Sequence, residues 1–173
     1  MTDNLLTATD IRPGTYHVDP TRSTVRFTAT HVFGLKPVDG TMIIRSGTVT
    51  VADEPRRSTA SATIDASTFA TDNPKRDRDI RSKRFLDVEN HPVIGFRSTR
   101  LSGGGAGWQI VGVLSVRGGS SEVTLDVVEI APTVDGYRFT ATTAVDRVAA
   151  GVGAGRAIIG RTLQATLTLC VTA

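Results

Sequence analysis

The sequence predicts an all-β protein, an antiparallel barrel of about eight strands with one short helix. Three observations predict it. Apolar and polar residues alternate along several stretches, turn residues separate these stretches at short intervals, and one charged segment breaks the alternation. Period-two alternation is typical of strands with one buried and one solvated face, which favours antiparallel pairing. Strands at this spacing indicate a sandwich or an up-and-down barrel.

The alternating stretches define which side chains should face the core. Their apolar series are Val25, Phe27, Ala29 and His31; Ala60, Ala62 and Ile64; Val123, Leu125 and Val127; Tyr137, Phe139, Ala141 and Val145; and Leu163, Ala165, Leu167, Leu169 and Val171. In the last stretch Cys170 falls on the outer face. Turns are predicted at the pairs Asp19-Pro20, Asp39-Gly40, Glu54-Pro55, Gly118-Gly119 and Asp135-Gly136.

Two further stretches, Val93–Leu101 and Trp108–Arg117, are predicted to form a hairpin through the glycine-rich residues 102–107. The stretch Trp108–Val116 is apolar on both faces. We therefore expect a helix or a partner subunit to cover its outer side.

The segment Asn73–Leu86 is predicted to be helical, because it carries many charges and does not alternate. Asn73 can serve as the N-cap, and Pro74 suits the first helical position. Asp77 and Arg81 are four residues apart and can form an ion pair on the helix surface. The later glycine-rich segment 149–160 has no predicted conformation.

Composition restricts the class of protein. The 173 residues fit one domain, and a net charge of +3 is far below the basic excess of nucleic-acid binders. A single cysteine, Cys170, excludes an intrachain disulfide and fits a reducing compartment. The first residues resemble no signal peptide, and no apolar run is long enough to span a membrane. We expect a cytoplasmic protein with a flexible segment over residues 1–13 and a barrel domain over residues 14–173.

Small residues on the inward face raise the question of a cavity. Alanine occupies inward positions 29, 60, 62, 141 and 165, where a packed barrel often carries larger side chains. An eight-stranded barrel can be filled by its own side chains or can hold one ligand. An apolar lipid would bind such a cavity by burial alone, at about 0.8 kcal/mol per CH₂ group. Alternation looks the same in both cases, so a packed core and a cavity stay equally open.

Three blocks of sequence resemble the YceI-like family. The first is Thr15–Pro20 followed by Ser23–Phe27 and His31, and the last is Gly112–Gly118. The central block is the most specific: it comprises Thr71, Asn73, Lys75–Asp77, Ile80–Ser82, Phe85–Asp87, His91-Pro92 and Phe96. The resemblance runs from about residue 14 to residue 147 and departs from the family pattern at Val148–Gly151.

The resemblance implies a lipocalin-like barrel that binds polyisoprenoid chains or fatty-acid-like lipids and forms a homodimer. It implies no catalytic residues. We therefore expect a non-catalytic binding or carrier protein without a cofactor. The alternatives are an enzyme that modifies such a lipid, with His31 and either Asp19 or Arg81 as acid and base, and a structural barrel without a ligand.

The expected ligand-binding residues are inward aromatic side chains and polar groups near the barrel mouth. They are Phe27, His31, Phe33, Arg81, Phe85, Phe96, Trp108 and Phe139, and each is also compatible with an ordinary core or surface role. The basic run from Lys75 to Arg84 fits a phosphate clamp or a transient contact with an anionic membrane surface. A solvated helix face, with Arg76, Asp77 and Arg81 pairing, is the preferred interpretation. The three histidines lack metal-ligand spacing.

Overall fold

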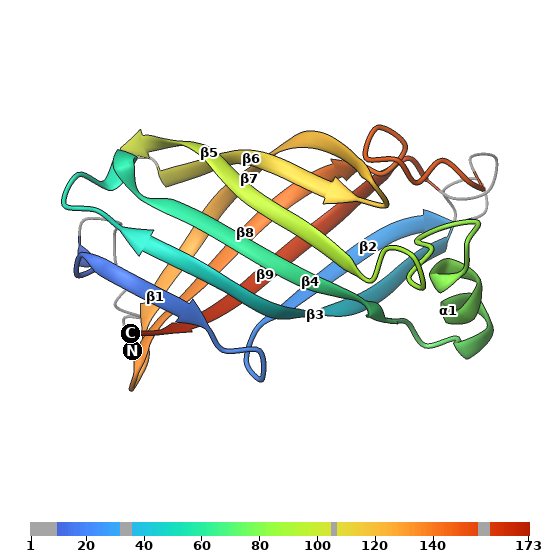
Figure 1. The fold of residues 1–173 in the computed structure, drawn as a ribbon, viewed down its shortest axis with the longest axis horizontal. Coiled ribbons are helices and arrows are strands. Elements are labelled where there is room, and N and C mark those ends of the chain that lie inside the picture. Colours follow the sequence, from blue (N-terminus) through green and yellow to red (C-terminus); the bar gives the residue numbers. More distant parts are fainter. Residues whose placement is uncertain (1–9, 32–35, 105–106, 156–159) are drawn as a thin grey trace.

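The strands form one closed antiparallel sheet in a computed structural model that describes residues 10–31, 36–104, 107–155 and 160–173. Figure 1 shows the barrel lying along its length, with helix α1 at one end. Within the described residues the elements are β1 (Gly14–Val18), β2 (Thr24–His31), β3 (Lys36–Val51), the short 3-10 helix η2 (Pro55–Arg57), β4 (Thr59–Ala70), α1 (Pro74–Arg81), β5 (Val93–Gly104), β6 (Gly107–Val116), β7 (Gly119–Pro132), β8 (Gly136–Asp146) and β9 (Thr162–Thr172).

The barrel closes with eight positions around its wall. Sequential strands from β2 to β9 pair with one another, and β9 pairs back onto β2. Strand β1 adds no position, because it pairs with the same two neighbours as β2, namely β3 and β9. Together β1 and β2 therefore occupy one position along the wall, interrupted by the turn that begins at Asp19. This confirms the predicted all-β barrel of about eight strands.

Strand β3 is the longest strand and differs from the sequence prediction at one point. It runs through Asp39-Gly40, where a turn was expected. Gly40 is present because the Phe27 ring lies against its backbone: a Cβ atom there would be 2.3 Å from Phe27 Cζ. Two register shifts, between Thr41 and Ile43 and between Ile44 and Ser46, let the strand bend around the barrel.

The predicted alternation matches the inside and outside of the barrel. Most members of the predicted apolar series of β2, β4, β7, β8 and β9 line the interior described below. Cys170 is an exception, because it is buried, not solvated, on the outer face. The turn between β1 and β2 lies against it: the fully buried Ser23 hydroxyl accepts from Cys170 N at 3.0 Å and donates to Cys170 O at 3.2 Å.

Helix α1 begins as predicted and ends earlier. The Asn73 side chain accepts hydrogen bonds from the backbone N–H groups of Lys75 and Arg76, and Pro74 is the first helical residue. The helix ends at Arg81, not at Leu86, because Ser82 adopts an extended backbone conformation. Residues 83–86 then form a turn, which carries two buried side chains toward the barrel, those of Phe85 and Leu86.

The expected ion pair between Asp77 and Arg81 is wrong. Asp77 is buried, and its carboxylate accepts from the backbone N–H and the hydroxyl of Thr71. Arg81 instead donates to the carbonyl of Phe69 through Nε at 3.0 Å and also through Nη2. Both side chains therefore hold the helix to the end of β4, because each forms hydrogen bonds with residues outside the helix and not with the other.

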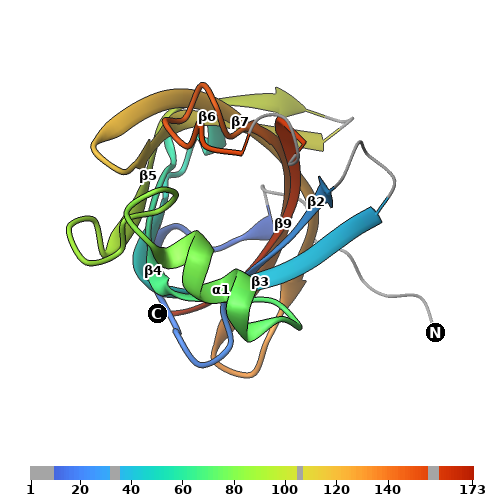
Figure 2. The ribbon, with the colours of Figure 1, turned by 90° about the vertical axis from the view of Figure 1, so that its right-hand side faces the viewer.

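Helix α1 packs on the end of β4, across one mouth of the barrel. Figure 2 shows this mouth end-on, with α1 on one side and the segment after β8 on the other. The helix does not cover the outer face of β6, contrary to one of the two expectations. The predicted hairpin is confirmed, since β5 and β6 pair from Gly95 with Ser115 to Gly104 with Gly107.

The opposite end of the barrel carries β1 and the residues before it. Ile11 is buried there, although residues 1–13 were expected to be flexible. The Arg12 backbone is held on both sides: its N–H donates to the Tyr137 hydroxyl at 3.2 Å, and its carbonyl accepts from the Tyr16 hydroxyl at 2.7 Å. The two tyrosine rings meet edge to face, with centroids 5.4 Å apart. Burial among these groups raises the pKa of Tyr16.

Candidate functional site: an apolar lumen in two chambers

The interior of the barrel is hollow along much of its length. Two chambers lie along it, with about 1360 Å³ and 930 Å³ of space that no protein atom fills, counting space open to solvent. The lining of both is almost entirely apolar, which is the property that lets a cavity stay dry and accept an apolar ligand.

The larger chamber lies at the α1 end. Its walls come from the inward faces of most strands, and Ile80, Phe85 and Leu86 close part of the mouth. Phe27, one of the expected ligand-binding residues, lines it and stacks on Phe69, with ring centroids 5.1 Å apart. Three polar or charged residues interrupt the apolar lining in the described part of the chain: Arg76, Thr143 and Arg147.

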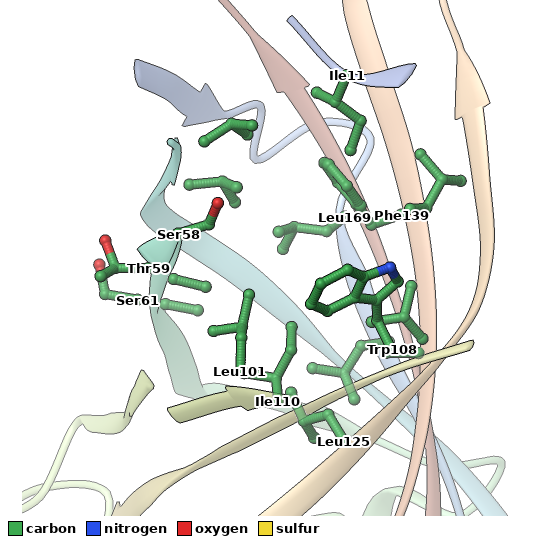
Figure 3. A pocket seen from close by; sticks show the side chains of 18 of the residues that line it. Ile11, Ser58, Thr59, Ser61, Leu101, Trp108, Ile110, Leu125, Phe139 and Leu169 are labelled. Atoms are coloured by element: carbon green, nitrogen blue, oxygen red, sulfur yellow. The ribbon is translucent and has the colours of Figure 1, made fainter. Parts of the chain in front are cut away.

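The smaller chamber lies toward the β1 end and is lined by Trp108 and Phe139, as predicted, and by Ile11. Figure 3 shows the Trp108 ring in this chamber beside Ile110 and Leu101. Ser58, Thr59 and Ser61 are its polar lining residues, and the Ser58 hydroxyl already accepts a hydrogen bond from the Ala52 N–H at 3.0 Å. Strand alternation turns Thr59 and Ser61 away from the face that Ala60 and Ala62 present to the interior.

The two chambers meet at three side chains. Phe96, Leu125 and Leu167 line both of them, so they lie at the boundary between one chamber and the other. Phe96 was predicted to line the pocket from its position in the central sequence block. No sequence pattern indicates that Phe96 lies where the two chambers adjoin.

Arg147 fixes the segment that follows β8. The side chain is only 5% exposed and donates to three backbone carbonyls. Its Nε reaches Gly160 O at 2.8 Å, and its Nη1 reaches Val152 O at 2.7 Å and Ala154 O at 2.8 Å. These bonds fold the described part of the glycine-rich segment, for which no conformation was predicted, against the mouth of the larger chamber. Ala150 and Val152 consequently join the lining.

Two arginines of the basic run, Arg76 and Arg81, differ in position. Arg76 lines the larger chamber, where its Nη2 pairs with Asp72 at 2.5 Å and its Nε donates to the Thr71 hydroxyl at 3.1 Å. Arg81, named as a binding residue from the sequence, does not line either chamber and instead holds Phe69 as described above. Arg76 and Arg147 therefore lie on opposite sides of the same mouth of the lumen.

Two predicted site residues cannot be placed. Phe33 and the side chain of His31 lie outside the described residues. Asp19, considered as a partner of His31 in acid–base chemistry, precedes β2, whereas His31 is the last residue of that strand. A strand rises about 3.3 Å per residue, so nearly the whole length of β2 separates their backbones.

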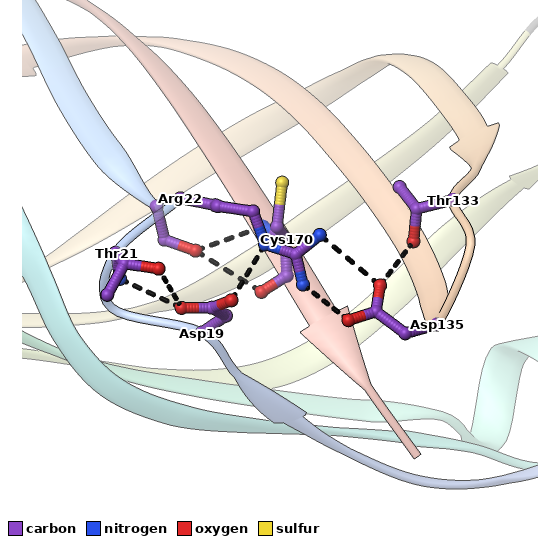
Figure 4. Close-up of polar contacts among 7 residues, drawn as sticks. Asp19, Thr21, Arg22, Thr133, Asp135 and Cys170 are labelled. Atoms are coloured by element: carbon purple, nitrogen blue, oxygen red, sulfur yellow. Dashed lines mark hydrogen bonds and ion pairs between the residues drawn. The ribbon is translucent and has the colours of Figure 1, made fainter.

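Asp19 belongs instead to a polar network on the outside of the β1 end. Figure 4 shows Arg22 between Asp19 and Asp135, at 2.7 Å from each carboxylate. Hydrogen bonds from the Thr21 hydroxyl and the Arg22 guanidinium lower the pKa of Asp19 to about 2. Arg22 also lowers the pKa of Asp135. The network ties the turn after β1 to the turn before β8.

Sequence reasoning missed Arg147 and Thr143 as residues of the lumen. A signal for both was present, because the inward series Tyr137, Phe139 and Ala141 continues at every second position through Thr143 and Arg147. An arginine at an inward position of a barrel strand marks either a buried polar tether or a ligand contact.

Other kinds of site find no support in the described residues. No group of three or more His, Cys, Asp or Glu side chains gathers there in a way that could hold a metal ion. The helices in this part of the chain are too short or too polar to cross a membrane.

Comparison with known proteins identifies relatives. Residues 16–171 match the model of the YceI-like domain, so the match includes the C-terminal strand beyond the atypical segment. A UPF0312 protein of Serratia proteamaculans is 34% identical over 73 residues, which cover 42% of this chain and 38% of the relative. A UPF0312 protein of Yersinia pestis is 31% identical over 81 residues, covering 46% and 42%. The alignments thus span less than half of these relatives.

Solved structures share the fold at low sequence identity. The crystal structure of Burkholderia cenocepacia BcnA has a TM-score of 0.77 at 22% identity and covers 90% of this chain and 99% of its own. A polyisoprenoid binding domain from Saccharophagus degradans, implicated in plant cell wall breakdown, has a TM-score of 0.63 at 14% identity, with coverage of 91% and 98%. These likenesses establish the fold.

Proposed function

The chain belongs to the YceI-like domain family, and from this premise we propose that it is a non-catalytic carrier of a long-chain isoprenoid or similar amphiphilic lipid. The observation that supports the proposal is the pair of adjoining apolar chambers inside the barrel. Each buried CH₂ group contributes about 0.8 kcal/mol, so a long chain binds without any specific polar contact. The polyisoprenoid binding domain with the same fold points to the same class of ligand.

The polar head of the ligand belongs, in this proposal, at the α1 end. Arg76, Thr143 and Arg147 give the lining at that end its polar and positively charged groups, while the far chamber offers a nearly unbroken apolar wall. The Thr143 hydroxyl already donates to Thr124 O at 2.7 Å, and Arg147 already holds backbone carbonyls, so in this proposal Arg76 contacts the head. Charge-assisted hydrogen bonds from guanidinium groups favour an anionic or strongly polar head, such as a phosphate or carboxylate.

The direct test is to purify the protein gently, extract it with organic solvent and identify the lipid by mass spectrometry. Two variants make the test specific to the lumen. Ala165→Phe places a large ring in the larger chamber, whereas Gln164→Phe places the same ring on the outer face of the same strand. We expect the first variant to lose the lipid and the second to retain it. Absence of any lipid from the unaltered protein, with none taken up on addition, would contradict the proposal.

The proposal includes a cytoplasmic homodimer that touches a membrane surface transiently to exchange its lipid. The single cysteine is compatible with a reducing compartment, and the basic residues of α1 lie on one side of the mouth through which a lipid would pass. Cell fractionation tests the location, and light scattering after gel filtration tests the dimer. Sedimentation with anionic vesicles, compared with neutral ones, tests the membrane contact.

A further inference from the structure

The side chains of Phe96, Leu125 and Leu167 mark the boundary between the two chambers of the lumen. Phe96 projects inward from β5, and in the register of the sheet it lies between Ala62 on β4 and Leu114 on β6. Leu125 comes from β7 and Leu167 from β9. Side chains from several parts of the barrel wall therefore converge on this boundary.

Gly112 gives the Phe96 ring its position. A Cβ atom at Gly112 would lie 2.5 Å from both Cε2 and Cζ of Phe96 and 2.6 Å from the carbonyl oxygen of Arg97. The ring thus lies directly over the backbone of β6, in space that any other residue would occupy. A ring held in this way is a fixed part of the wall at the boundary between the two chambers.

The two chambers differ in what they can hold. The larger one has charged and polar residues at its mouth. The smaller one, around Trp108, is almost entirely apolar: the Ser58 hydroxyl is already hydrogen-bonded, and strand alternation turns Thr59 and Ser61 outward. A head group gains nothing in the smaller chamber and would lose its hydration there. A lipid whose head group stays at the α1 mouth therefore reaches the smaller chamber only if its chain is long enough, and narrow enough in cross-section, to pass Phe96.

We propose that Phe96, with Leu125 and Leu167, is the chain-selecting constriction of this protein: it admits the end of a long chain from the larger chamber into the Trp108 chamber. This inference rests on the proposed lipid-carrier function and adds the direction of the chain and the residues that select it. Short chains stay in the larger chamber, and long chains gain extra burial beyond the constriction. Each methylene that passes strengthens binding by about fourfold.

Trp108 is the only tryptophan in the chain, so its fluorescence reports on the smaller chamber alone. The probes are palmitic acid carrying bromine, a fluorescence quencher, either at the chain end or beside the carboxylate, and octanoic acid brominated at the chain end. We expect the end-labelled palmitic acid to quench Trp108. We expect the other two acids to bind with little quenching.

Two variants of β9 provide the matched comparison. Leu167→Phe narrows the constriction, whereas Thr166→Phe places a ring on the outer face of the same strand, outside both chambers. We expect Leu167→Phe to abolish quenching by end-labelled palmitic acid and to weaken its binding by about fourfold per excluded methylene. Octanoic acid should bind this variant as before, and Thr166→Phe should retain the quenching.

A third variant avoids overpacking. Phe96→Ala widens the passage and should improve the binding of methyl-branched phytanic acid relative to palmitic acid. Equal quenching by both bromine positions, or unchanged selectivity in Leu167→Phe and Phe96→Ala, would overturn the constriction and leave the carrier function intact. If no acid of any length binds and no lipid co-purifies, the carrier function fails and this inference fails with it.

Discussion

At the scale of single residues, two charged groups have roles that their surroundings decide. Arg147 is buried and donates hydrogen bonds to three backbone carbonyls of the segment that borders the larger chamber. These bonds hold the segment in place where no helix or strand does so. Arg22, in contrast, joins two carboxylates in solvent at the other end of the barrel. Each role leads to a prediction.

Replacing Arg147 with methionine should destabilise the protein by about 3 kcal/mol, because buried carbonyls lose hydrogen bonds from a charged donor. Arg147→Lys should recover only part of this loss, since an ammonium group cannot reproduce the planar fork. Urea unfolding measures the free energy, and hydrogen exchange should be faster at the Val152 amide, which donates to Arg147 O at 2.8 Å. The exposed Arg161, paired with Asp146, is the control. Equal losses in Arg161→Met and Arg147→Met would contradict the prediction.

The Arg22 network should make stability depend on pH in the acid range. The folded-state pKa of Asp19 is about 2, below the ordinary value of 3.8. A lowered folded-state pKa contributes stability above the unfolded pKa and loses it as the pH falls through the folded one. The loss should therefore lie between about pH 4 and pH 2, and Asp135, whose pKa is also lowered, adds to it.

Arg22→Met tests this dependence. We expect the variant to be less stable than the native protein near neutral pH and to show a shallower decline on acidification, measured by urea unfolding at a series of pH values. Carboxyl titration by NMR should show the pKa of Asp19 rising toward its ordinary value. Arg26→Met, on the exposed face of β2, is the control. A decline as steep in Arg22→Met as in the native protein would exclude the network as its cause.

At the scale of elements, local sequence signals determine where α1 begins, and tertiary contacts determine where it ends. Asn73 and Pro74 determine where the helix begins, and both signals are visible in the sequence. Its end is decided elsewhere. Phe85 and Leu86 are buried against the lumen, and Arg81 is drawn to Phe69, so the chain leaves the helix after Arg81 although its composition would allow another turn.

Asn73→Ala should cost about 1 kcal/mol of stability, because the N–H groups of Lys75 and Arg76 lose their acceptor. Asn73→Asp retains an acceptor and should be nearly neutral. Urea unfolding gives the difference, and hydrogen exchange at the first turn of α1 shows where it arises. The same variant should release a bound lipid faster, since Arg76 and Ile80 border the mouth. The prediction fails if the alanine and aspartate variants behave alike.

At the scale of the whole molecule, the hollow interior couples stability to the ligand. A barrel with two open chambers lacks the packing contacts that a filled core provides. A lipid in the lumen supplies them and binds only the folded state. The protein should therefore be more stable with its lipid than without it.

Removing the lipid should lower the melting temperature, and restoring it should stabilise the fold by about 2.7 kcal/mol at a free ligand concentration about 100 times Kd. Calorimetry of extracted and reloaded protein measures the effect. Ala165→Phe should show no ligand-dependent shift, because its ring occupies the larger chamber, whereas Gln164→Phe should behave as the native protein. A shift of equal size in both variants would indicate binding outside the lumen.

The sequence by itself determined the strands, their inward faces and the start of the helix, because these depend on neighbours within a few residues. It also carried the central block that marks the family. Only the tertiary structure decided that the interior is open. It also decided that Arg76 and Arg147 both border one mouth of the lumen and that Phe96 lies at the boundary between the two chambers. The physical reason is closure. Alternation is identical in a filled and a hollow barrel, and the width of the lumen follows from how many strands close the wall and with what stagger.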